Sequence, residues 1–357
     1  MATLIIHTQG TLVEARAAHL RIVTPEGIRT ELPLVGIERL HAYGKVQITT
    51  QALTVLAEAG KEVAWFSRGG RLRARLAVNG AGGGVAVRRA QYHAADEPAY
   101  ALQLAQRLVA AKLHNQRSVL QRAWRARSDQ ADPALLASIA TRIDDLDEAT
   151  TLDQVRGFEG TTAAQYFPAW AAATGAIFPW NGRNRRPPRD PLNMLLSFGY
   201  TLLANEVQAQ LEAVGLDPWL GFLHAERPGH AALASDLMEP LRPMLVDRLI
   251  LDLVGHRRIG WEHIEQHRLD VARDPQRLDD ADPPDEASDR SVQTIPRLTD
   301  EGRKIFITAW ERRLAHEDAD DGTTTGGRKM LSDQVVAFAR SLRDGNQDLY
   351  APIRLRT

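Results

Sequence analysis

The pattern of hydrophobic and polar positions divides the chain into two parts. Residues 1–78 contain short runs rich in β-branched residues with turn residues between them, which is typical of strands. The expected strands are 3–7, 12–16, 19–24, 28–34, 46–50 and 63–66, with one short helix at 51–59. This first part is therefore predicted to be a small β-rich domain.

After residue 86 the apolar residues recur at the spacing of helices. The expected helices are 87–127, 133–147, 152–174, 191–215, 245–254, 299–314 and 332–343. Asp190 followed by Pro191 is the clearest helix start, an N-cap with proline at the first helical position. The fold class expected is α+β multidomain: a β-rich domain at 1–78, a glycine-rich linker at 79–86, and a larger all-α domain at 87–357.

Composition excludes several kinds of site. The chain has 357 residues and no cysteine, which rules out disulfides, zinc–thiolate sites and thiol nucleophiles. It has no Gly-x-Ser-x-Gly motif of serine hydrolases, and its glycine-rich segment lacks the Gly-Lys-Ser/Thr of a phosphate loop. No uninterrupted apolar run is long enough to span a membrane, and no signal peptide is indicated. We therefore expect a cytoplasmic protein without a membrane partner.

The net charge of −1 conceals an uneven distribution of charges. Residues 270–289 contain eight acidic residues and two arginines, and residues 316–321 contain four more acids, so the remainder is net positive. A near-neutral total is thus no argument against a nucleic-acid partner. The segment GRNRRPPR carries four arginines and no acid, and they are candidates for phosphate contacts or simply a solvated face: Arg183, Arg185, Arg186 and Arg189.

Candidate chemistry lies in the stretch GFLHAERPGHAALASDLMEP, which contains His224, Asp236 and Glu239. Two acids three residues apart share one face of a helix, and Pro240 places Glu239 at the helix end. Carboxylate oxygens suit Mg²⁺, and an added imidazole favours Mn²⁺. The alternatives are a histidine satisfied in the core and an acid on a surface helix.

A further carboxylate, Glu159, stands between two glycines in the segment GFEGTTAAQYF. The residues alone leave open whether it faces solvent or a site.

Several motifs in order resemble the CRISPR-associated integrase of spacer acquisition, the Cas1 family. They are VGIERLHAYGKVQITTQALTVLAEAGKEVAWFS, QVRGFEGTTAAQYF, RRPPRDPLNMLLSFGYTLLANEV, GFLHAERPGHAALASDLMEPLRPMLVDRLIL and LTDEGRKIFITAWERRL. Together they run over most of the chain. This combination is far more specific than any one of the motifs.

The resemblance implies a divalent metal site, with Mg²⁺ or Mn²⁺ bound by Glu159, His224 and Glu239, the catalytic residues. Asp236 stands where the family has a further acid, as a supporting or alternate ligand. Arg242 and Arg248 lie nearby in the sequence as candidate DNA contacts, and Arg242 alternatively shapes the site. The other alternative for both arginines is a surface ion pair. One departure concerns Gly229-His230-Ala231: the family commonly has an arginine after this glycine, so a phosphate contact at that position is in doubt.

The resemblance also implies the activity and the partners. The family joins short prespacer duplexes to a CRISPR array, by attack of a 3′-hydroxyl on a phosphodiester, and acts on double-stranded and branched DNA. Its β-rich domain mediates a homodimer, and two dimers flank a dimer of the small Cas2 protein in a heterohexamer. The alternatives are a structure-selective DNA repair nuclease and a catalytically silent DNA-binding scaffold.

We predict that the acidic segment 270–289 does not contact DNA, because its charge repels phosphates and its prolines disfavour regular structure. Deleting it should leave integration of a short duplex into repeat DNA unchanged. Loss of that activity in a deletion variant with an unchanged circular dichroism spectrum would contradict the prediction.

Overall fold

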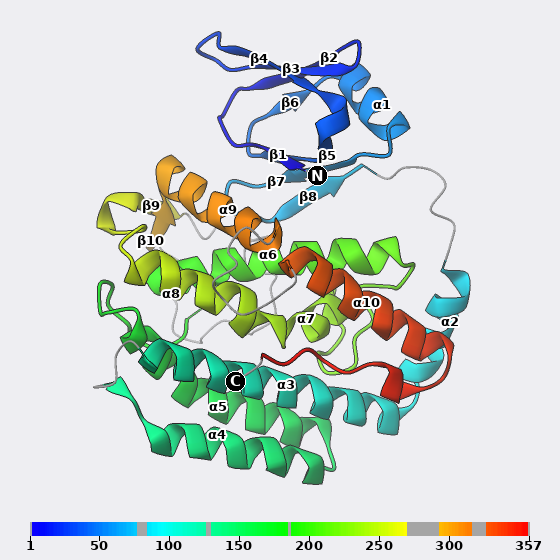
Figure 1. Ribbon diagram of the computed structural model, residues 1–357, viewed down its shortest axis with the longest axis vertical. Coiled ribbons are helices and arrows are strands. Elements are labelled where there is room, and N and C mark those ends of the chain that lie inside the picture. Colours follow the sequence, from blue (N-terminus) through cyan, green and yellow to red (C-terminus); the bar gives the residue numbers. More distant parts are fainter. Residues whose placement is uncertain are drawn as a thin grey trace. The chain divides into compact units, whose positions relative to one another are not determined.

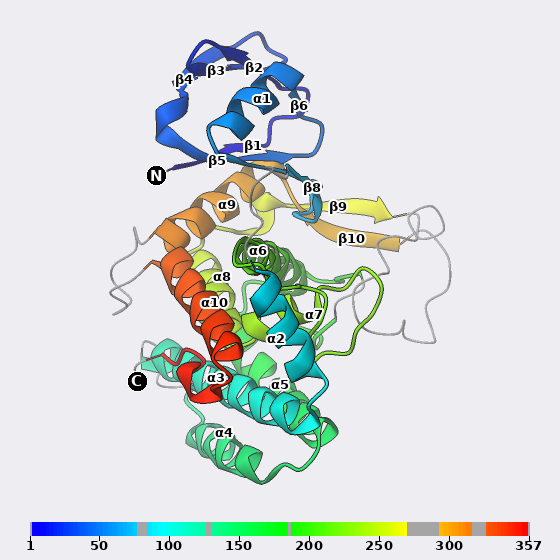
Figure 2. The same ribbon diagram turned by 90° about the vertical axis from the view of Figure 1, so that its right-hand side faces the viewer.

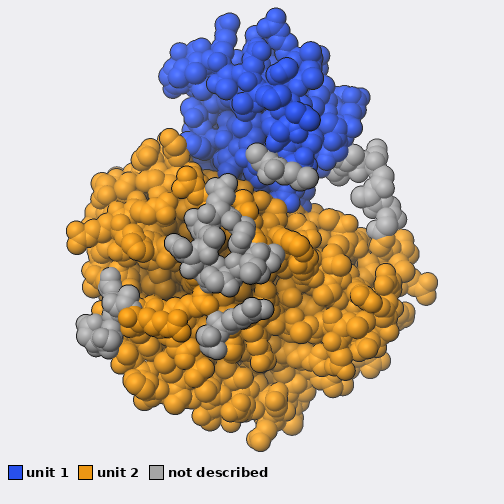
Figure 3. Space-filling model, viewed as in Figure 1, with its two compact units in different colours: residues 1–82 blue, residues 83–357 orange. Residues whose placement is uncertain are grey.

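The computed structural model describes residues 2–76, 84–125, 130–184, 187–269, 293–315 and 326–355. Contacts divide the chain into two compact units, Met1–Gly82 and Gly83–Thr357 (Figure 3). Most of the predicted linker at 79–86 and the whole acidic segment 270–289 lie outside the described residues.

Two four-stranded sheets form the first unit (Figure 1). One has the order β1-β5-β7-β8, with the first three strands parallel, and the other has the order β4-β3-β2-β6. The strands are β1 (Ala2–Ile6), β2 (Leu12–Arg16), β3 (His19–Val23), β4 (Arg29–Pro33), β5 (Ile37–Tyr43), β6 (Gln47–Ile48), β7 (Glu62–Phe66) and β8 (Leu72–Arg75). The helix α1 (Thr50–Glu58) contacts β2 of one sheet and β7 of the other.

The core of this unit lies between the sheets and α1. Leu20, Leu40, Leu56 and Val63 have no exposed surface, and they come from both sheets and the helix. Burial of large aliphatic side chains stabilises such a unit by about 1.5–3 kcal/mol for each side chain. The predicted β-rich domain is thus confirmed, although the pattern did not indicate β5, the strand between β1 and β7.

The second unit is largely helical (Figures 1 and 2). Its α-helices are α2 (Val85–Ala95), α3 (Pro98–Arg125), α4 (Pro133–Asp145), α5 (Leu152–Ala173), α6 (Pro191–Ala213), α7 (Ala232–Met238), α8 (Arg248–Gly255), α9 (Asp300–Ala315) and α10 (Gly327–Arg343). A π-helical turn, Arg242–Asp247, leads into α8. The long helix α3 packs against α4, α5 and this turn, and many of its residues are buried.

Two details of the helical unit correct the sequence prediction. The expected all-α character of residues 87–357 has an exception, because β9 (Ile264–Leu269) and β10 (Gln293–Leu298) form an antiparallel pair. The expected helix 87–127 is two helices, since Pro98 begins a new one. No helix in the described ranges is long and apolar enough to cross a membrane.

Helix α6 begins as predicted. The carboxylate of Asp190 accepts a hydrogen bond from the backbone N–H of Asn193 at 2.9 Å, and Pro191 occupies the first position of the helix. Further along, Gly199 permits a close approach to the π-helical turn: a Cβ there would lie 2.5 Å from Cγ1 of Val246. This contact fixes α6 beside the segment that follows Glu239.

We predict that Gly199→Ala destabilises the protein by about 1–3 kcal/mol, because the added methyl group overpacks the contact with Val246. Gly157→Ala is the matched control, since a Cβ at that helical glycine meets nothing within 4 Å. The control should be neutral, or stabilising by up to about 1 kcal/mol. Urea unfolding of both variants measures the difference, and equal stabilities would show that the contact tolerates a larger side chain.

Candidate active site

A buried lysine on α3 joins two of the carboxylates singled out in the sequence. Nζ of Lys112 lies 2.5 Å from Oε1 of Glu159 on α5, and 2.6 Å from Oε2 of Glu239, which follows α7. The Lys112 and Glu239 side chains are 6% and 3% exposed, whereas that of Glu159 is 29% exposed. The cluster is therefore buried at Lys112 and Glu239 and partly exposed at Glu159, and we call this exposed side the rim.

His224 lies on that rim and is held by Asp236. The Asp236 carboxylate accepts hydrogen bonds from the backbone N–H groups of Phe222, Leu223 and His224, and it lies 2.7 Å from Nδ1 of the His224 ring. Nε2 of the same ring then faces Glu239, 3.8 Å from its Oε1. A fully buried carboxylate thus fixes the ring and leaves Nε2 directed toward the cluster.

Gly221 permits the loop to approach this carboxylate. A Cβ at that position would lie 2.9 Å from Oδ2 of Asp236. The glycine before Phe222 is therefore required for the close wrapping of backbone N–H groups around Asp236.

A second polar network begins at Arg242. Its Nη2 lies 3.4 Å from Oε1 of Glu239, and its guanidinium stacks over the ring of Tyr200 at 5.0 Å. Tyr200 and Tyr166 donate hydrogen bonds to the buried carboxylate of Asp247, at 2.6 and 2.8 Å. Arg242 and Asp247 are the two ends of the π-helical turn, and both reach the same tyrosine.

The charges in these networks shift pKa values in opposite directions. Burial alone would raise the pKa of Glu239, but Arg242 and Lys112 lower it to about 2. Burial raises the pKa of Asp247 to about 6, against the effect of its two tyrosine donors. Glu239 is thus held ionised, and its contribution to stability is present above pH 4.5 and lost as the pH falls toward 2.

The three ligands expected from the resemblance lie together, but not as a ready metal site. Within the described ranges, no cluster of three or more histidine and acidic side chains has an arrangement that could hold a metal ion. The Lys112 ammonium lies between Glu159 and Glu239 instead. The donor set still fits a divalent ion, because two carboxylates already flank a cation and an oriented imidazole faces one of them. Asp236 uses both oxygens on the loop and the ring, which favours its supporting role.

The candidate DNA-binding arginines differ in their surroundings. Arg183 is half-buried, donates a hydrogen bond to Oδ1 of Asn193 at 2.6 Å, and stacks over Phe167 and Tyr200. Arg242 is engaged by Glu239 and Tyr200, and Arg248 is half-buried.

Arg189 is exposed, and Arg185 and Arg186 lie outside the described residues. Of the four arginines whose side chains are described, Arg189 is therefore the one most open to a DNA phosphate.

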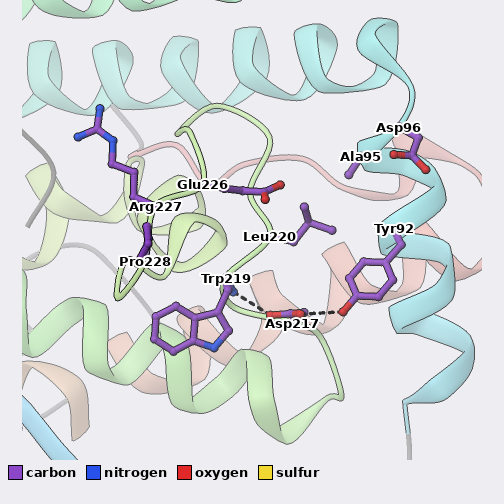
Figure 4. Close-up of a pocket in the computed structure, with 9 residues that line it drawn as sticks. All are labelled: Tyr92, Ala95, Asp96, Asp217, Trp219, Leu220, Glu226, Arg227 and Pro228. Atoms are coloured by element: carbon purple, nitrogen blue, oxygen red, sulfur yellow. Dashed lines mark hydrogen bonds between the residues drawn. The ribbon is translucent and has the colours of Figure 1, made fainter.

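A pocket of about 650 Å³ borders the loop after His224 (Figure 4). Asp217 lies between Tyr92 and Trp219, accepting from the Tyr92 hydroxyl at 2.8 Å and from the Trp219 backbone N–H at 2.9 Å. The remaining lining includes Asp96, Glu226 and Arg227. Because carboxylates outnumber basic groups there, a DNA backbone is disfavoured in this pocket.

Together, the β-rich unit, the helical unit and the cluster of acids around one oriented histidine define a class of protein: a two-unit protein with a candidate metal centre in its helical part. The sequence profile described as "CRISPR associated protein Cas1" matches residues 4–275. The chain belongs to the Cas1 family.

Relatives and solved structures agree with this assignment. "CRISPR-associated endonuclease Cas1 2" of Rhodospirillum rubrum is 33% identical over 98% of this chain and 97% of its own length. A casposase bound to an integration product has a TM-score of 0.77 at 20% identity, covering 100% of this chain and 95% of that one. A Cas6-RT-Cas1–Cas2 complex has a TM-score of 0.76 at 22% identity, covering 100% of this chain and 36% of the longer polypeptide. These two structures share the fold.

The sequence reasoning missed Lys112 and Asp247. A signal for Lys112 was present: it is the only lysine between residues 62 and 303, and it interrupts the apolar run VAAKL on a helix. Charged residues at such positions are rarely buried unless paired. Asp247 has the same kind of signal, an acid after the apolar run MLV.

We predict that Asp247→Asn flattens the pH dependence of stability between pH 4 and 6. The folded-state pKa of Asp247, about 6, lies above the unfolded value of 3.8, so the native state binds more protons in this window. Wild-type stability should fall as the pH rises through it, by on the order of 1–3 kcal/mol relative to the variant. Urea unfolding across the window measures this, with the exposed Asp333→Asn as control. Parallel curves for wild type and Asp247→Asn would refute it.

Proposed function

We propose that this protein is a metal-dependent DNA integrase and endonuclease of CRISPR adaptation. The observation that carries the proposal is the convergence of Glu159, His224 and Glu239 at one partly open site. A relative that matches this chain over nearly its full length is named an endonuclease, which supports the same activity. We place its action in the cytoplasm, on double-stranded and branched DNA.

The proposed reaction is strand transfer. The 3′-hydroxyl of a prespacer strand loses its proton and forms a new P–O bond with a phosphodiester at the end of a repeat. The P–O bond to the displaced 3′-oxygen breaks, and that oxygen takes up a proton, so no net proton is gained or lost. Mg²⁺ or Mn²⁺ held by Glu159, Glu239 and Nε2 of His224 would polarise the phosphate. Water in place of the hydroxyl gives endonucleolytic cleavage.

The chain's own residues prepare this chemistry. Asp236 holds the His224 ring so that Nε2 faces Glu239, and Arg242 keeps Glu239 ionised. The rim formed by Glu159 and His224 is accessible from solvent, since their side chains are 29% and 31% exposed. Arg189 is the described arginine proposed to contact the DNA backbone, together with Arg185 and Arg186 of the same segment.

For partners, we propose a homodimer formed through the β-rich unit and a heterohexamer with a Cas2 dimer. The name of the Cas6-RT-Cas1–Cas2 complex, whose Cas1 part has the fold of this chain, supports Cas2 as the partner. A silent DNA-binding scaffold is a second candidate, and one observation favours it: an ammonium group stands between two of the expected ligands.

The test is a strand-transfer assay with a short duplex, supercoiled repeat DNA, Cas2 and either Mg²⁺ or Mn²⁺. Glu159→Gln, His224→Ala and Glu239→Gln should each lose about 100-fold or more in rate, because each removes a proposed ligand. The exposed Glu148→Gln and His256→Ala are matched controls and should react as wild type does.

Each outcome has a distinct meaning. Reaction by all three ligand variants at the wild-type rate would place the metal elsewhere. Absence of any product with wild type, including on a preformed branched substrate, would favour the scaffold over the integrase.

A further inference from the structure

Lys112 has no role in the reaction as proposed, yet it contacts two of the three proposed ligands. Its ammonium lies 2.5 and 2.6 Å from carboxylate oxygens of Glu159 and Glu239, and the residue is 5% exposed. A buried charge is costly unless it is paired and hydrogen-bonded. The two carboxylates therefore stabilise the buried charge of Lys112, and Lys112 in turn holds the two carboxylates close to each other.

The choice of lysine is unusual for this chain. Lysine occurs at only five positions, and between residues 62 and 303 arginine supplies every other basic side chain apart from histidine. A guanidinium is a broad planar fork, whereas an ammonium is a compact point charge that several oxygens can surround. At this position the chain has the side chain that most resembles a bare cation.

The position of the ammonium supports that comparison. Nζ of Lys112 lies between Oε1 of Glu159 and Oε2 of Glu239, and carboxylate oxygens are also the ligands that hard divalent cations prefer. A metal ion bound between the two acids through Oε1 of Glu159 and Oε2 of Glu239 would require the space that the ammonium occupies. The ammonium and the metal therefore cannot both occupy the position between the carboxylates.

We propose that Lys112 is a built-in competitor of the metal: its ammonium holds Glu159 and Glu239 in place without metal, and a divalent ion that binds between these two carboxylates must displace it. The proposal rests on the proposed function for the identity of the ligands. Lys112 is thus a positioning residue that lowers the affinity of the site for metal.

Metal affinity of the DNA-free protein tests the proposal directly. Lys112→Met removes the competing charge, so its dissociation constant for Mn²⁺, measured by electron paramagnetic resonance of free Mn²⁺, should be at least about tenfold lower than that of wild type. Lys112→Arg keeps the charge and should not bind more tightly than wild type. Lys112→Gln, which retains an N–H donor for the carboxylates, should behave as Lys112→Met does and serves if that variant does not fold.

A purely structural lysine gives the opposite result, because its loss would leave metal affinity unchanged or weaken it. Folded Lys112→Met and Lys112→Gln proteins that bind Mn²⁺ no more tightly than wild type would overturn the proposal. Thermal unfolding gives a second readout: compared with wild type, Lys112→Met should unfold at a lower temperature in a chelator, and Mn²⁺ should raise its unfolding temperature by more.

A measurement on the wild-type protein needs no folding of a variant. With five lysines, protein labelled with ¹³C at lysine Cε gives few signals. Adding Mg²⁺ should shift one of them, that of Lys112. Stabilisation of the protein by Mg²⁺ with no lysine signal moving would overturn the proposal.

The two proposals fail separately. Tighter Mn²⁺ binding by Lys112→Met in a protein without strand-transfer activity would support the competitor and reject the integrase. Strand transfer that depends on Glu159 and Glu239, together with Lys112 variants that bind Mn²⁺ as wild type does, would support the integrase and reject the competitor.

Discussion

One buried ammonium group connects the elements that build the candidate site. Lys112 on α3 binds Glu159 on α5 and Glu239 after α7, so three segments separated in the sequence meet at one charge. Removing one partner of a buried ion pair typically costs about 3–5 kcal/mol, because the other charge is left uncompensated. The packing of α3 against α5 and the π-helical turn thus depends on these buried ion pairs as well as on apolar contacts.

How far the site could be predicted is clearest at His224. The spacing of Asp236 and Glu239 placed both acids on one face of a helix end, and in the structure they approach the two nitrogens of this ring. The resemblance added Glu159, which composition alone could not distinguish from a solvent-facing acid. The apolar run around Lys112 indicated its burial but not its partners, because only the packing of α5 and the Glu239 segment places acids beside it.

In the fold as well, features set by neighbouring residues could be predicted, whereas features set by tertiary contacts could not. Asp190 and Pro191 determine a helix start through their own chemistry, and the structure confirms it. Strand β5 has a different origin: Ile37–Tyr43 contains few β-branched residues and two charged ones, so its local preference is weak. It is a strand because it pairs with β1 on one side and β7 on the other, a tertiary condition that overrides propensity.

The side chain of Asn115, one turn along α3 from Lys112, joins distant parts of the chain. Its amide donates to the carbonyl of Pro240 at 2.7 Å and to that of Ile353 at 3.0 Å, and its oxygen accepts from the backbone N–H of Leu355. The residue after Glu239 is therefore tied to a segment translated more than a hundred residues later. During synthesis on the ribosome, the surroundings of Glu239 stay incomplete until that segment emerges, which delays assembly of the site until nearly all of the helical unit is available to fold.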